Sequence, residues 1–341
     1  MSVTYKDVVG AARRIAGHVL RTPVLEISPG LFLKLEQLQH SGSFKVRGAF
    51  NRILSAGAPP PSGVIAASGG NHGLAVAYAA RALGIRAEIF VPDVTSPVKL
   101  AGLRALGAEI TQGGAIYSEA AEAAAKRAAE TGALEVHAYD QPEVVAGQGT
   151  TGLELVEQTG GVDTVLVAVG GGGFVSGITL GVRGPEAPAP TLTPAPAPTP
   201  TPAPAPAPTS ETATATGASG GSATRVVAVE PELIPTLHDA LEAGRPVPVP
   251  VRGVAADALG ATRIGGLAFD ICSRAGVRSL LVPDDAIAAA RRALWERHRV
   301  AAEHAGATAY AALLSGAYTP APGERVAIMV CGSNTDPGTL A

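Results

Sequence analysis

Cysteine, lysine and aromatic residues are scarce in this chain of 341 residues. Its two cysteines, Cys272 and Cys331, lie far apart and have no His or Cys neighbour at the spacing of a metal site. This excludes a disulfide-rich scaffold and a zinc finger, and it suits a reducing compartment. We therefore expect a cytoplasmic protein held together by an apolar core.

An excess of charge of one sign is also missing. The chain has 26 basic and 29 acidic residues, a formal net charge of -3, and no stripe of basic residues. This argues against a nucleic-acid surface and against binding to an acidic membrane. We expect a small soluble molecule as the partner, with no nucleic acid and no membrane.

One uncharged run, residues 164–182, is long enough to resemble a membrane span. Four consecutive glycines interrupt it, so a short strand, a glycine turn and a buried helix explain it better. Residues 1–20 carry charge throughout and lack an apolar core followed by a cleavage site. They do not predict a secretory signal.

Short β-branched runs alternate with longer Ala-rich helical patterns along the chain. The strands are expected at residues 31–36, 63–67, 87–91, 109–111, 164–169, 225–230, 279–282 and 326–330, and helices at 71–83, 97–106, 116–131 and 174–181. This alternation predicts an α/β fold with mostly parallel sheets. The length exceeds that of one core, so we expect two open sheets with a cleft between them.

Residues 185–224 interrupt this pattern with Pro-Ala and Pro-Thr repeats that pass into Thr, Ser, Gly and Ala. Such a composition cannot bury a core, so we predict a disordered insert, partly polyproline II. A role as a Pro-rich ligand is the alternative, but the stretch lacks the basic flanks and aromatic residues that would help it dock.

Lys45 is one of only five lysines and follows small polar residues between an expected strand and a helical pattern. An amine in that setting can be partly desolvated, which lowers its pKa and enables it to form an imine with a carbonyl cofactor. The alternative is an ordinary surface lysine at the start of a helix.

Gly170, Gly171, Gly172 and Gly173, here called the glycine cup, directly follow the strand expected at 164–169 and precede a helical run. Consecutive backbone N–H groups at a helix N-terminus bind anions, so these glycines predict a phosphate site. A plain turn is the alternative. No Gly-Lys-Ser/Thr follows, and the spaced glycines of a dinucleotide site are missing.

A second polar segment, Ser68, Gly69, Gly70, Asn71 and His72, also links a strand to a helix. Its amides and the Ser68 hydroxyl could bind a carboxylate, and Asn71 could bind a phenolic oxygen. The alternative is a Ser/Asn helix cap. His72 suggests a general base, although a histidine in a first helical turn is more often structural.

Cys331 ends the last apolar strand and begins the segment 331–336. Open α/β sheets bind ligands at the carboxyl ends of their strands. The thiol is therefore either a small buried hydrophobe or a group that faces the nitrogen of a heterocycle.

Together these segments resemble the fold-type II pyridoxal-phosphate enzymes, in particular the serine/threonine dehydratase (threonine ammonia-lyase) family, which is related to serine racemase. The resemblance covers nearly the whole chain except the insert, at residues 21–23, 35–36, 41–48, 67–73, 91–92, 146–150, 170–177, 229–231, 303–307 and 331–336. It implies a fold like that of the tryptophan synthase β-subunit. It also implies a large cofactor-binding domain, residues 1–51 and 143–341, a small mobile domain, residues 52–142, and a homodimer.

The resemblance further implies a role for each candidate residue toward pyridoxal 5'-phosphate. Lys45 would hold the cofactor as a Schiff base, Phe44 would pack on its ring, and Asn71 would contact its phenolic oxygen. The glycine cup would bind the phosphate. Cys331 would face the pyridine nitrogen as a neutral partner, which leaves the ring a weaker electron sink.

Substrate binding and chemistry are implied in the same way. The segment from Ser68 to His72 would hold the substrate carboxylate, and Lys45 would remove the Cα proton. Glu303 matches an acidic residue near the cofactor, although His304 stands where the family has proline. The products would be 2-oxobutanoate from L-threonine or pyruvate from L-serine, with ammonia. No acidic set follows Glu230, so no metal is assigned.

Two departures from the family refine the expected activity. Gly69 stands where the racemases have a second serine, so racemisation should be poor. The sequence ends at Ala341, soon after the last expected strand, so feedback control by a C-terminal regulatory domain is not expected.

Several alternatives stay open at this point. The enzyme could act on a bulkier 3-hydroxy amino acid, such as phenylserine or hydroxyaspartate, or it could be a β-replacing synthase. A catalytically inactive cofactor-binding protein is the non-enzymatic alternative. The sequence does not decide the preferred substrate, a cation site, the oligomeric state or the role of the insert.

Overall fold

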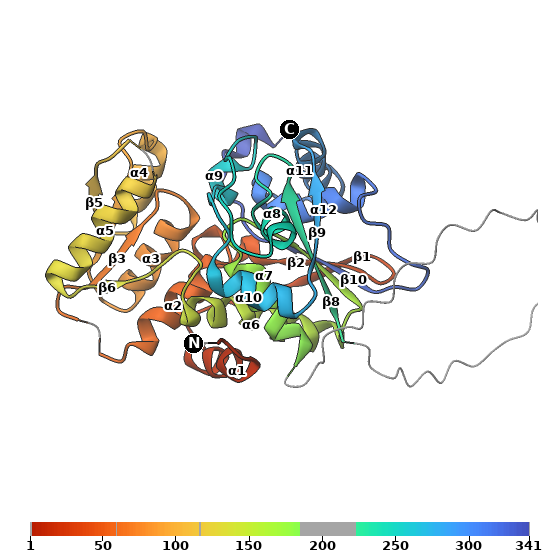
Figure 1. Cartoon of the computed structure of the whole chain (residues 1–341), viewed down its shortest axis with the longest axis horizontal. Helices are drawn as coiled ribbons and strands as arrows, with labels where there is room; N and C mark the ends of the chain where they lie inside the picture. The colour runs from red at the N-terminus through yellow and green to blue at the C-terminus, as the bar shows by residue number, and fades with distance from the viewer. Residues whose placement is uncertain (1, 59, 116, 185–222, 341) are drawn as a thin grey trace, which may run out of the picture.

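The computed structural model describes residues 2–58, 60–115, 117–184 and 223–340 and contains two open sheets (Figure 1). The strand order is β1-β2-β10-β7-β8-β9 in the larger sheet and β5-β4-β3-β6 in the smaller one. The strands are β1 (Val24–Ser28), β2 (Leu31–Leu35), β3 (Val64–Ala67), β4 (Ala87–Val91), β5 (Glu109–Gln112), β6 (Leu134–Glu135), β7 (Thr164–Ala168), β8 (Arg225–Pro231), β9 (Arg278–Val282) and β10 (Val326–Val330).

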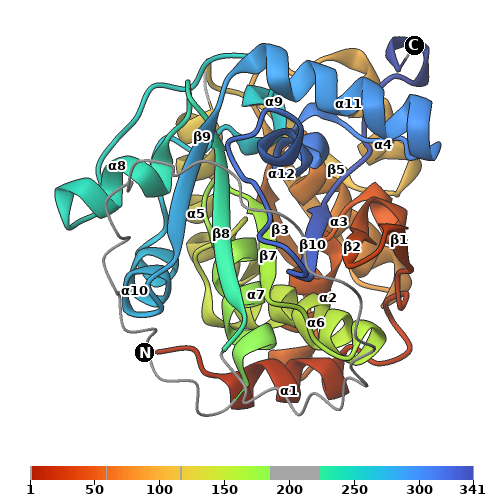
Figure 2. The ribbon, with the colours of Figure 1, turned by 90° about the vertical axis from the view of Figure 1, so that its right-hand side faces the viewer.

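The larger sheet is parallel except for the antiparallel pair β1 and β2. Its central strands β7 and β10 are buried along their whole length, because helices cover both faces, and all their residues except Thr164 are apolar. Figure 2 shows α11 (Asp284–His298) and α12 (His304–Leu314) on one side, and α6 (Pro142–Thr159) and α7 (Gly173–Arg183) on the other. We call this part the six-stranded half.

The smaller sheet is entirely parallel. Alternate residues of its strands face opposite ways: Val64 packs with α3 (Asn71–Ala82), whereas Ile65 packs with α5 (Tyr117–Thr131). This is the period-two pattern of a strand covered on both faces. We call the part that contains this sheet the four-stranded half.

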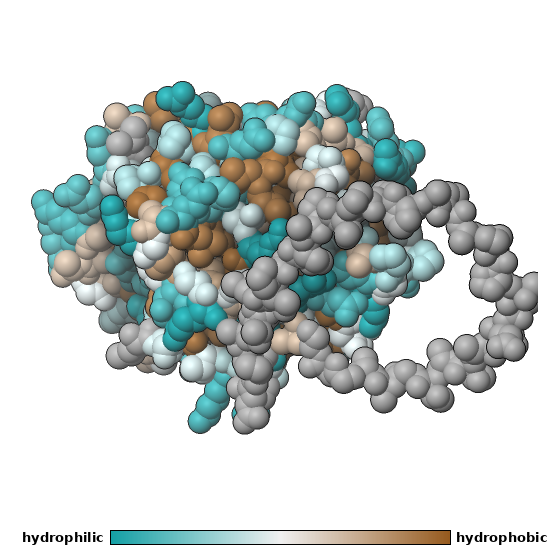
Figure 3. Space-filling view, turned by 45° about the vertical axis from the view of Figure 1, so that its right-hand side comes forward, coloured by the Kyte–Doolittle hydropathy of each residue, from teal (hydrophilic) through white to brown (hydrophobic). Residues whose placement is uncertain are grey.

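The remaining helices complete the two halves. They are α1 (Tyr5–Arg14), α2 (Lys45–Ser55), α4 (Pro97–Ala105), α8 (Thr236–Ala243), α9 (Ala256–Leu259) and α10 (Gly266–Arg274). On the face drawn in Figure 3, teal hydrophilic side chains separate the brown hydrophobic areas.

The predicted α/β fold with two mostly parallel sheets is confirmed, and the expected strands begin and end within one or two residues of the observed ones. The uncharged run 164–182 forms β7, a glycine turn and α7. No helix in the described part of the chain is long and apolar enough to cross a membrane. Most of the predicted insert, residues 185–222, lies outside the described residues.

The candidate segments all follow the carboxyl ends of strands. Ser68 follows β3, Cys331 follows β10, and the glycine cup follows β7 after one further residue. Because β7 and β10 are parallel neighbours, their carboxyl ends lie at the same edge, where open sheets bind ligands. The segment after β3 comes from the other sheet and lines a cavity together with Gly171.

Candidate active site

Lys45 is the first residue of α2, and hydrogen bonds join the loop before it to the segment after β10. The Phe44 N–H donates to the Cys331 carbonyl at 3.1 Å, and the Ser333 N–H donates to the Gly42 carbonyl at 2.9 Å. Gly42 has a φ of +74°, and a Cβ there would lie 2.5 Å from the Asn334 amide oxygen, so only glycine suits this turn. Residues far apart in the sequence are thereby fixed around one lysine.

The Lys45 amine lies inside the protein, although its side chain is partly exposed. It donates a hydrogen bond to the Ala138 carbonyl at 2.7 Å. Burial lowers the pKa of Lys45 to about 8, while Cys331 and Glu303 oppose the shift. About a tenth of the amine is then uncharged at pH 7, far more than for an ordinary lysine. The alternative of a surface lysine is therefore wrong.

A buried ion network holds α2 in place two residues further on. The Arg47 guanidinium donates to the Glu36 carboxylate at 2.7 and 2.8 Å and to the Glu154 carboxylate at 2.7 and 2.8 Å. Lys34 also donates to Glu154 at 2.8 Å. Burial alone would lower the pKa of Arg47, but the two carboxylates raise it above its usual value. The network ties α2 to β2 and α6.

The glycine cup leaves no room for side chains. A Cβ on Gly171 would overlap the Tyr139 ring, and one on Gly173 would lie 2.7 Å from the Tyr139 carbonyl. Gly172 has a φ of +86° and caps α7 without a side-chain hydrogen bond. The N–H groups at the start of α7 therefore stay available to an anion.

The segment from Ser68 to His72 also leaves a helix end open. Its N-cap is Gly70, and no side chain caps α3, so the alternative of a Ser/Asn cap is wrong. The Ser68 hydroxyl accepts a hydrogen bond from the Gly70 N–H at 3.1 Å. Gly69 is tightly surrounded, since a Cβ there would lie 2.8 Å from the Thr95 methyl group.

His72 is buried, and its Nε2 lies 2.8 Å from the Val136 carbonyl. Burial, followed by the nearby charge of Lys45, lowers the pKa of His72 to about 3. The ring is therefore a neutral donor to the backbone. This geometry favours the structural interpretation of His72 over a general base.

Half-buried Asn71 and buried Glu303 form a hydrogen-bonded pair beside Lys45. The Asn71 amide donates to the Glu303 carboxyl at 2.6 Å and accepts from the Asn334 amide at 2.7 Å. Burial raises the pKa of Glu303 to about 7, although the Asn71 hydrogen bond lowers it. Glu303 is thus partly protonated near neutral pH.

Cys331 is a small buried residue, and it also lies at the wall of a cavity. It is 3% exposed, its thiol donates to the Ala305 carbonyl at 3.5 Å, and it also lines the cavity that contains Lys45. Burial raises the pKa of the Cys331 thiol, so it is a neutral group. In the described part of the chain, no cluster of three or more His, Cys, Asp or Glu side chains is placed to hold a metal ion.

Two adjoining cavities meet at Lys45. The first contains the glycine cup, Phe44, Glu303 and Cys331. The second, of about 420 Å³, is lined by the segment from Ser68 to His72 and by residues of both halves. Tyr139 lines both cavities.

The chemical groups in the first cavity match those that would bind pyridoxal phosphate. It contains an amine of lowered pKa, a glycine cup and a neutral thiol, which suit the aldehyde, the phosphate and the ring nitrogen of the cofactor. The ring of Phe44 stacks on that of Phe174 at 4.0 Å, and the free volume is only about 40 Å³. Binding therefore requires side chains that line this cavity to shift.

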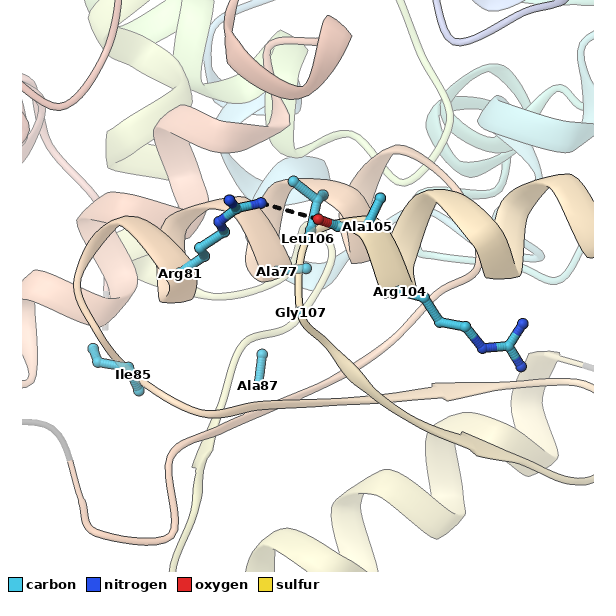
Figure 4. Close-up of a pocket in the computed structure, with 8 residues that line it drawn as sticks. All are labelled: Ala77, Arg81, Ile85, Ala87, Arg104, Ala105, Leu106 and Gly107. Atoms are coloured by element: carbon cyan, nitrogen blue, oxygen red, sulfur yellow. Dashed lines mark hydrogen bonds between the residues drawn. The ribbon is translucent and has the colours of Figure 1, made fainter.

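A third cavity, of about 370 Å³, lies on the four-stranded half away from Lys45 (Figure 4). Arg81 donates to the Ala105 carbonyl there at 2.9 Å, while Arg104 points away from it. It has no acid, nucleophile or glycine cup, so the chemistry belongs to the first two cavities.

Sequence reasoning missed Tyr139, Lys99 and Asp257. Tyr139 lies in a loop without a motif, and its proximity to Gly171 depends on the fold. The Lys99 amine and the Asp257 carboxylate form an ion pair in the wall of the second cavity. The scarcity of lysine, which drew attention to Lys45, was the one available signal for Lys99.

Comparison with known proteins agrees with this geometry. The family described as "Pyridoxal-phosphate dependent enzyme" matches residues 15–332. An L-threonine ammonia-lyase of Thermotoga maritima is 33% identical over 98% of this chain and 76% of its own. A phenylserine dehydratase of Ralstonia pickettii is 33% identical over 98% of this chain and 94% of its own.

Two solved structures have the same fold. The structure of maize serine racemase has a TM-score of 0.83 and 29% identity, covering 100% of this chain and 96% of its own. A crystal structure of threonine deaminase from T.th. has a TM-score of 0.80 and 34% identity, covering 98% of this chain and 99% of its own. The chain belongs to the pyridoxal-phosphate-dependent enzymes, in the fold-type II serine/threonine dehydratase family.

Proposed function

We propose that this protein is a pyridoxal-phosphate-dependent ammonia-lyase that converts L-threonine to 2-oxobutanoate, or L-serine to pyruvate, with release of ammonia. The observation that carries the proposal is the buried Lys45 amine, with a pKa of about 8, between the glycine cup and the open N-terminus of α3. The threonine ammonia-lyase and threonine deaminase among its relatives support this reaction.

Different residues of the first cavity would bind different groups of the cofactor. Lys45 would hold its aldehyde carbon, the N–H groups of the glycine cup its phosphate, and the neutral Cys331 thiol its ring nitrogen. Asn71 would lie beside its phenolic oxygen. When bound, the cofactor supplies an electron sink for the charge that develops at the substrate Cα.

The chain's own groups would carry the substrate and the proton. The N–H groups at the start of α3 and the Ser68 hydroxyl would bind the carboxylate, because a helix N-terminus favours negative charge. Once the substrate amine replaces it on the cofactor, the freed and uncharged Lys45 amine would take the Cα proton. Loss of the β-hydroxyl as water, and then hydrolysis, would give the 2-oxo acid and ammonia, so one water leaves and one is consumed.

A second candidate substrate class is a bulkier 3-hydroxy amino acid. The second cavity, of about 420 Å³, offers space beyond the carboxylate site, and the phenylserine dehydratase relative supports this alternative. A β-hydroxyaspartate dehydratase of Paracoccus denitrificans is also 32% identical over 98% of this chain. Lys99 in the cavity wall is the side chain that would suit a second carboxylate.

The test is a panel of L-threonine, L-serine, L-threo-phenylserine and 3-hydroxyaspartate, with 2-oxo acid and ammonia both measured. Lys45→Ala should remove turnover of every active substrate, whereas Lys126→Ala, at an exposed position of α5, should leave it unchanged. Turnover of phenylserine alone would move the assignment to the bulky class. Full cofactor binding without turnover of any of the four would contradict the enzyme and favour a binding protein.

We also propose that the protein is a cytoplasmic homodimer, in which residues 52–142 move as a small domain against residues 1–51 and 143–341. Analytical ultracentrifugation tests the dimer, and a monomer at micromolar concentration would contradict it. Hydrogen exchange with and without substrate tests the motion, which should change protection at the mouth of the second cavity.

A further inference from the structure

The carbonyl groups of Gly170, Gly171 and Gly172 accept hydrogen bonds from residues that do not line the first cavity. Gly170 O accepts from the Thr236 hydroxyl at 2.6 Å, and Gly171 O accepts from the Gly265 N–H at 3.1 Å. Gly172 O accepts from the Ser176 N–H at 3.0 Å and its hydroxyl at 2.8 Å. Each carbonyl of the cup that precedes another glycine is thus held in place.

The direction of these carbonyls determines where the N–H groups point. A trans peptide is planar, so the N–H of one residue points opposite to the carbonyl of the residue before it. Holding the carbonyls of Gly170, Gly171 and Gly172 therefore turns the N–H groups of Gly171, Gly172 and Gly173 the other way. An anion-binding cup needs these donors to converge.

Thr236 is the one side chain from a distant element among these donors. It is the first residue of α8, it is fully buried, and it lies 66 positions from Gly170. A carbonyl oxygen can only accept, so the short contact means that the Thr236 hydroxyl donates its hydrogen to Gly170. Glycines flank this peptide bond and have no Cβ to restrict its rotation. The hydrogen bond from the Thr236 hydroxyl is thus what restrains the rotation of the Gly170–Gly171 peptide.

Glu230, at the end of β8, holds Thr236 in turn. Its buried carboxyl group accepts from the N–H groups of Leu237 and His238, at 2.7 and 2.9 Å, and from the Ser279 hydroxyl at 2.5 Å. One of its oxygens also lies 3.0 Å from the Thr236 hydroxyl. Burying a carboxyl group is unfavourable unless such donors satisfy it. The satisfied Glu230 carboxyl group fixes the first turn of α8, which begins at Thr236.

We propose that Thr236 is a positioning residue for the phosphate of the cofactor: held by Glu230, it orients the Gly170–Gly171 peptide so that the Gly171 N–H points into the cup. Thr236 does not touch the cofactor. Its loss should weaken the phosphate contact and leave the rest of the cofactor site intact. The inference rests on cofactor binding by the proposed function and not on the choice of substrate.

The experiment compares Thr236→Val, which removes the hydroxyl but keeps the shape, with Thr236→Ser, which keeps the hydroxyl. Thr179→Val is the matched control, because Thr179 is equally buried and donates to the Val175 carbonyl inside α7 at 2.7 Å. Apoprotein of each variant is titrated with pyridoxal phosphate and with pyridoxal, which lacks the phosphate, and absorbance gives Kd. Thermal unfolding of the apoproteins confirms that each is folded.

Thr236→Val should raise the Kd for pyridoxal phosphate about tenfold, as expected for one lost hydrogen bond, and leave the Kd for pyridoxal unchanged. Thr236→Ser should stay within about twofold of wild type, and Thr179→Val should match wild type. An equal loss for both ligands, or no loss for either, would overturn the proposal. Thr236→Ala carries the same test if the valine variant does not fold.

Failure of this inference and failure of the proposed function are distinguishable. Wild type that binds the cofactor and turns over substrate, with the same cofactor affinity in Thr236→Val, contradicts the role of Thr236 alone. Wild type that binds the cofactor without any turnover contradicts the lyase, while a selective loss of phosphate affinity in Thr236→Val still supports the positioning role.

Discussion

The two halves of the molecule differ in whether they bury an ion pair completely. In the six-stranded half, Arg47 and Glu36 are fully buried and share a network with Glu154 and Lys34. In the four-stranded half, Arg86 bonds to Glu88 and Glu109, but its side chain is 40% exposed. Breaking a buried pair is far more destabilising than breaking an exposed one. The buried network thus anchors the start of α2, and with it Lys45, to the six-stranded half.

The largest effect should come from the buried network. Glu36→Gln leaves the Arg47 charge with one ionised partner fewer in the interior, and we expect it to lower the free energy of unfolding by about 3 kcal/mol. The control is Glu109→Gln, whose pair with Arg86 is exposed and should change stability by less than about 1 kcal/mol. Urea unfolding of both variants measures the difference. Equal losses would show that burial does not distinguish the two halves.

The glycine cup should show the next largest effect. Gly171→Ala places a methyl group against the Tyr139 ring, and the strain should weaken cofactor binding by about a hundredfold. Gly10→Ala is the control, because a Cβ on that helical residue meets nothing within 4 Å. Cofactor titration of the apoproteins measures both. Unchanged affinity in Gly171→Ala would mean that Tyr139 is free to move aside.

The sequence could predict those features whose signals lie close together in the chain. The signals for β7, the glycine cup and α7 are local, because a β-branched run, four glycines and an apolar helix follow one another directly. Lys45 could be predicted because lysine is rare. The location of Cys331 at the carboxyl edge of the sheet, where α/β folds bind ligands, was expected from a general rule about strand ends.

Contacts between distant segments could not be predicted in this way. The partners of Arg47 come from the turn after β2 and from α6, and Tyr139 meets Gly171 only in the folded chain. The helix α6 itself was missed because it contains glycines that pack against α2 and α7. A Cβ on Gly147 would lie 2.7 Å from the Arg47 carbonyl, so close helix packing selected a residue that is typical of a loop in sequence.

Glu303 lies between the halves and should make stability depend on pH. Burial raises its pKa from 4.5 to about 7, so the folded state binds more protons than the unfolded state between these values. Stability therefore falls as pH rises through this range. Glu303→Gln keeps an acceptor for Asn71 and removes the charge, so it should stabilise the apoprotein by about 2 kcal/mol more at pH 8 than at pH 5.

Urea unfolding of wild type and Glu303→Gln at the two pH values measures this difference. The matched control is Glu324→Gln in the six-stranded half, since hydrogen bonds such as that from Thr164 outweigh burial and lower the pKa of Glu324. The effect of Glu324→Gln on the free energy of unfolding should therefore not become more favourable at high pH. A constant difference between Glu303→Gln and wild type would mean that Glu303 is charged at both pH values.

The smallest effect should come from the ion pair that joins the halves. Lys99 lies on α4 and Asp257 on α9, and their side chains are 34% and 66% exposed. An exposed pair stabilises by less than about 1 kcal/mol, so Lys99→Met should leave unfolding nearly unchanged. Because the pair lies in the wall of the second cavity, its loss should make the cleft easier to open. We expect KM to rise about threefold, with kcat retained.

The control for this pair is Arg274→Met, which breaks another exposed pair, with Asp270 inside α10 and away from the cleft. It should leave KM unchanged. Salt provides a second test, since screening weakens exposed ion pairs. Added salt should bring the KM of wild type toward that of Lys99→Met. The KM of Asp257→Asn should match that of Lys99→Met, and the KM of the double variant should rise no further. A rise in KM that is additive in the double variant would mean that the two side chains contact substrate separately, and the four-stranded half would then contribute specificity rather than closure.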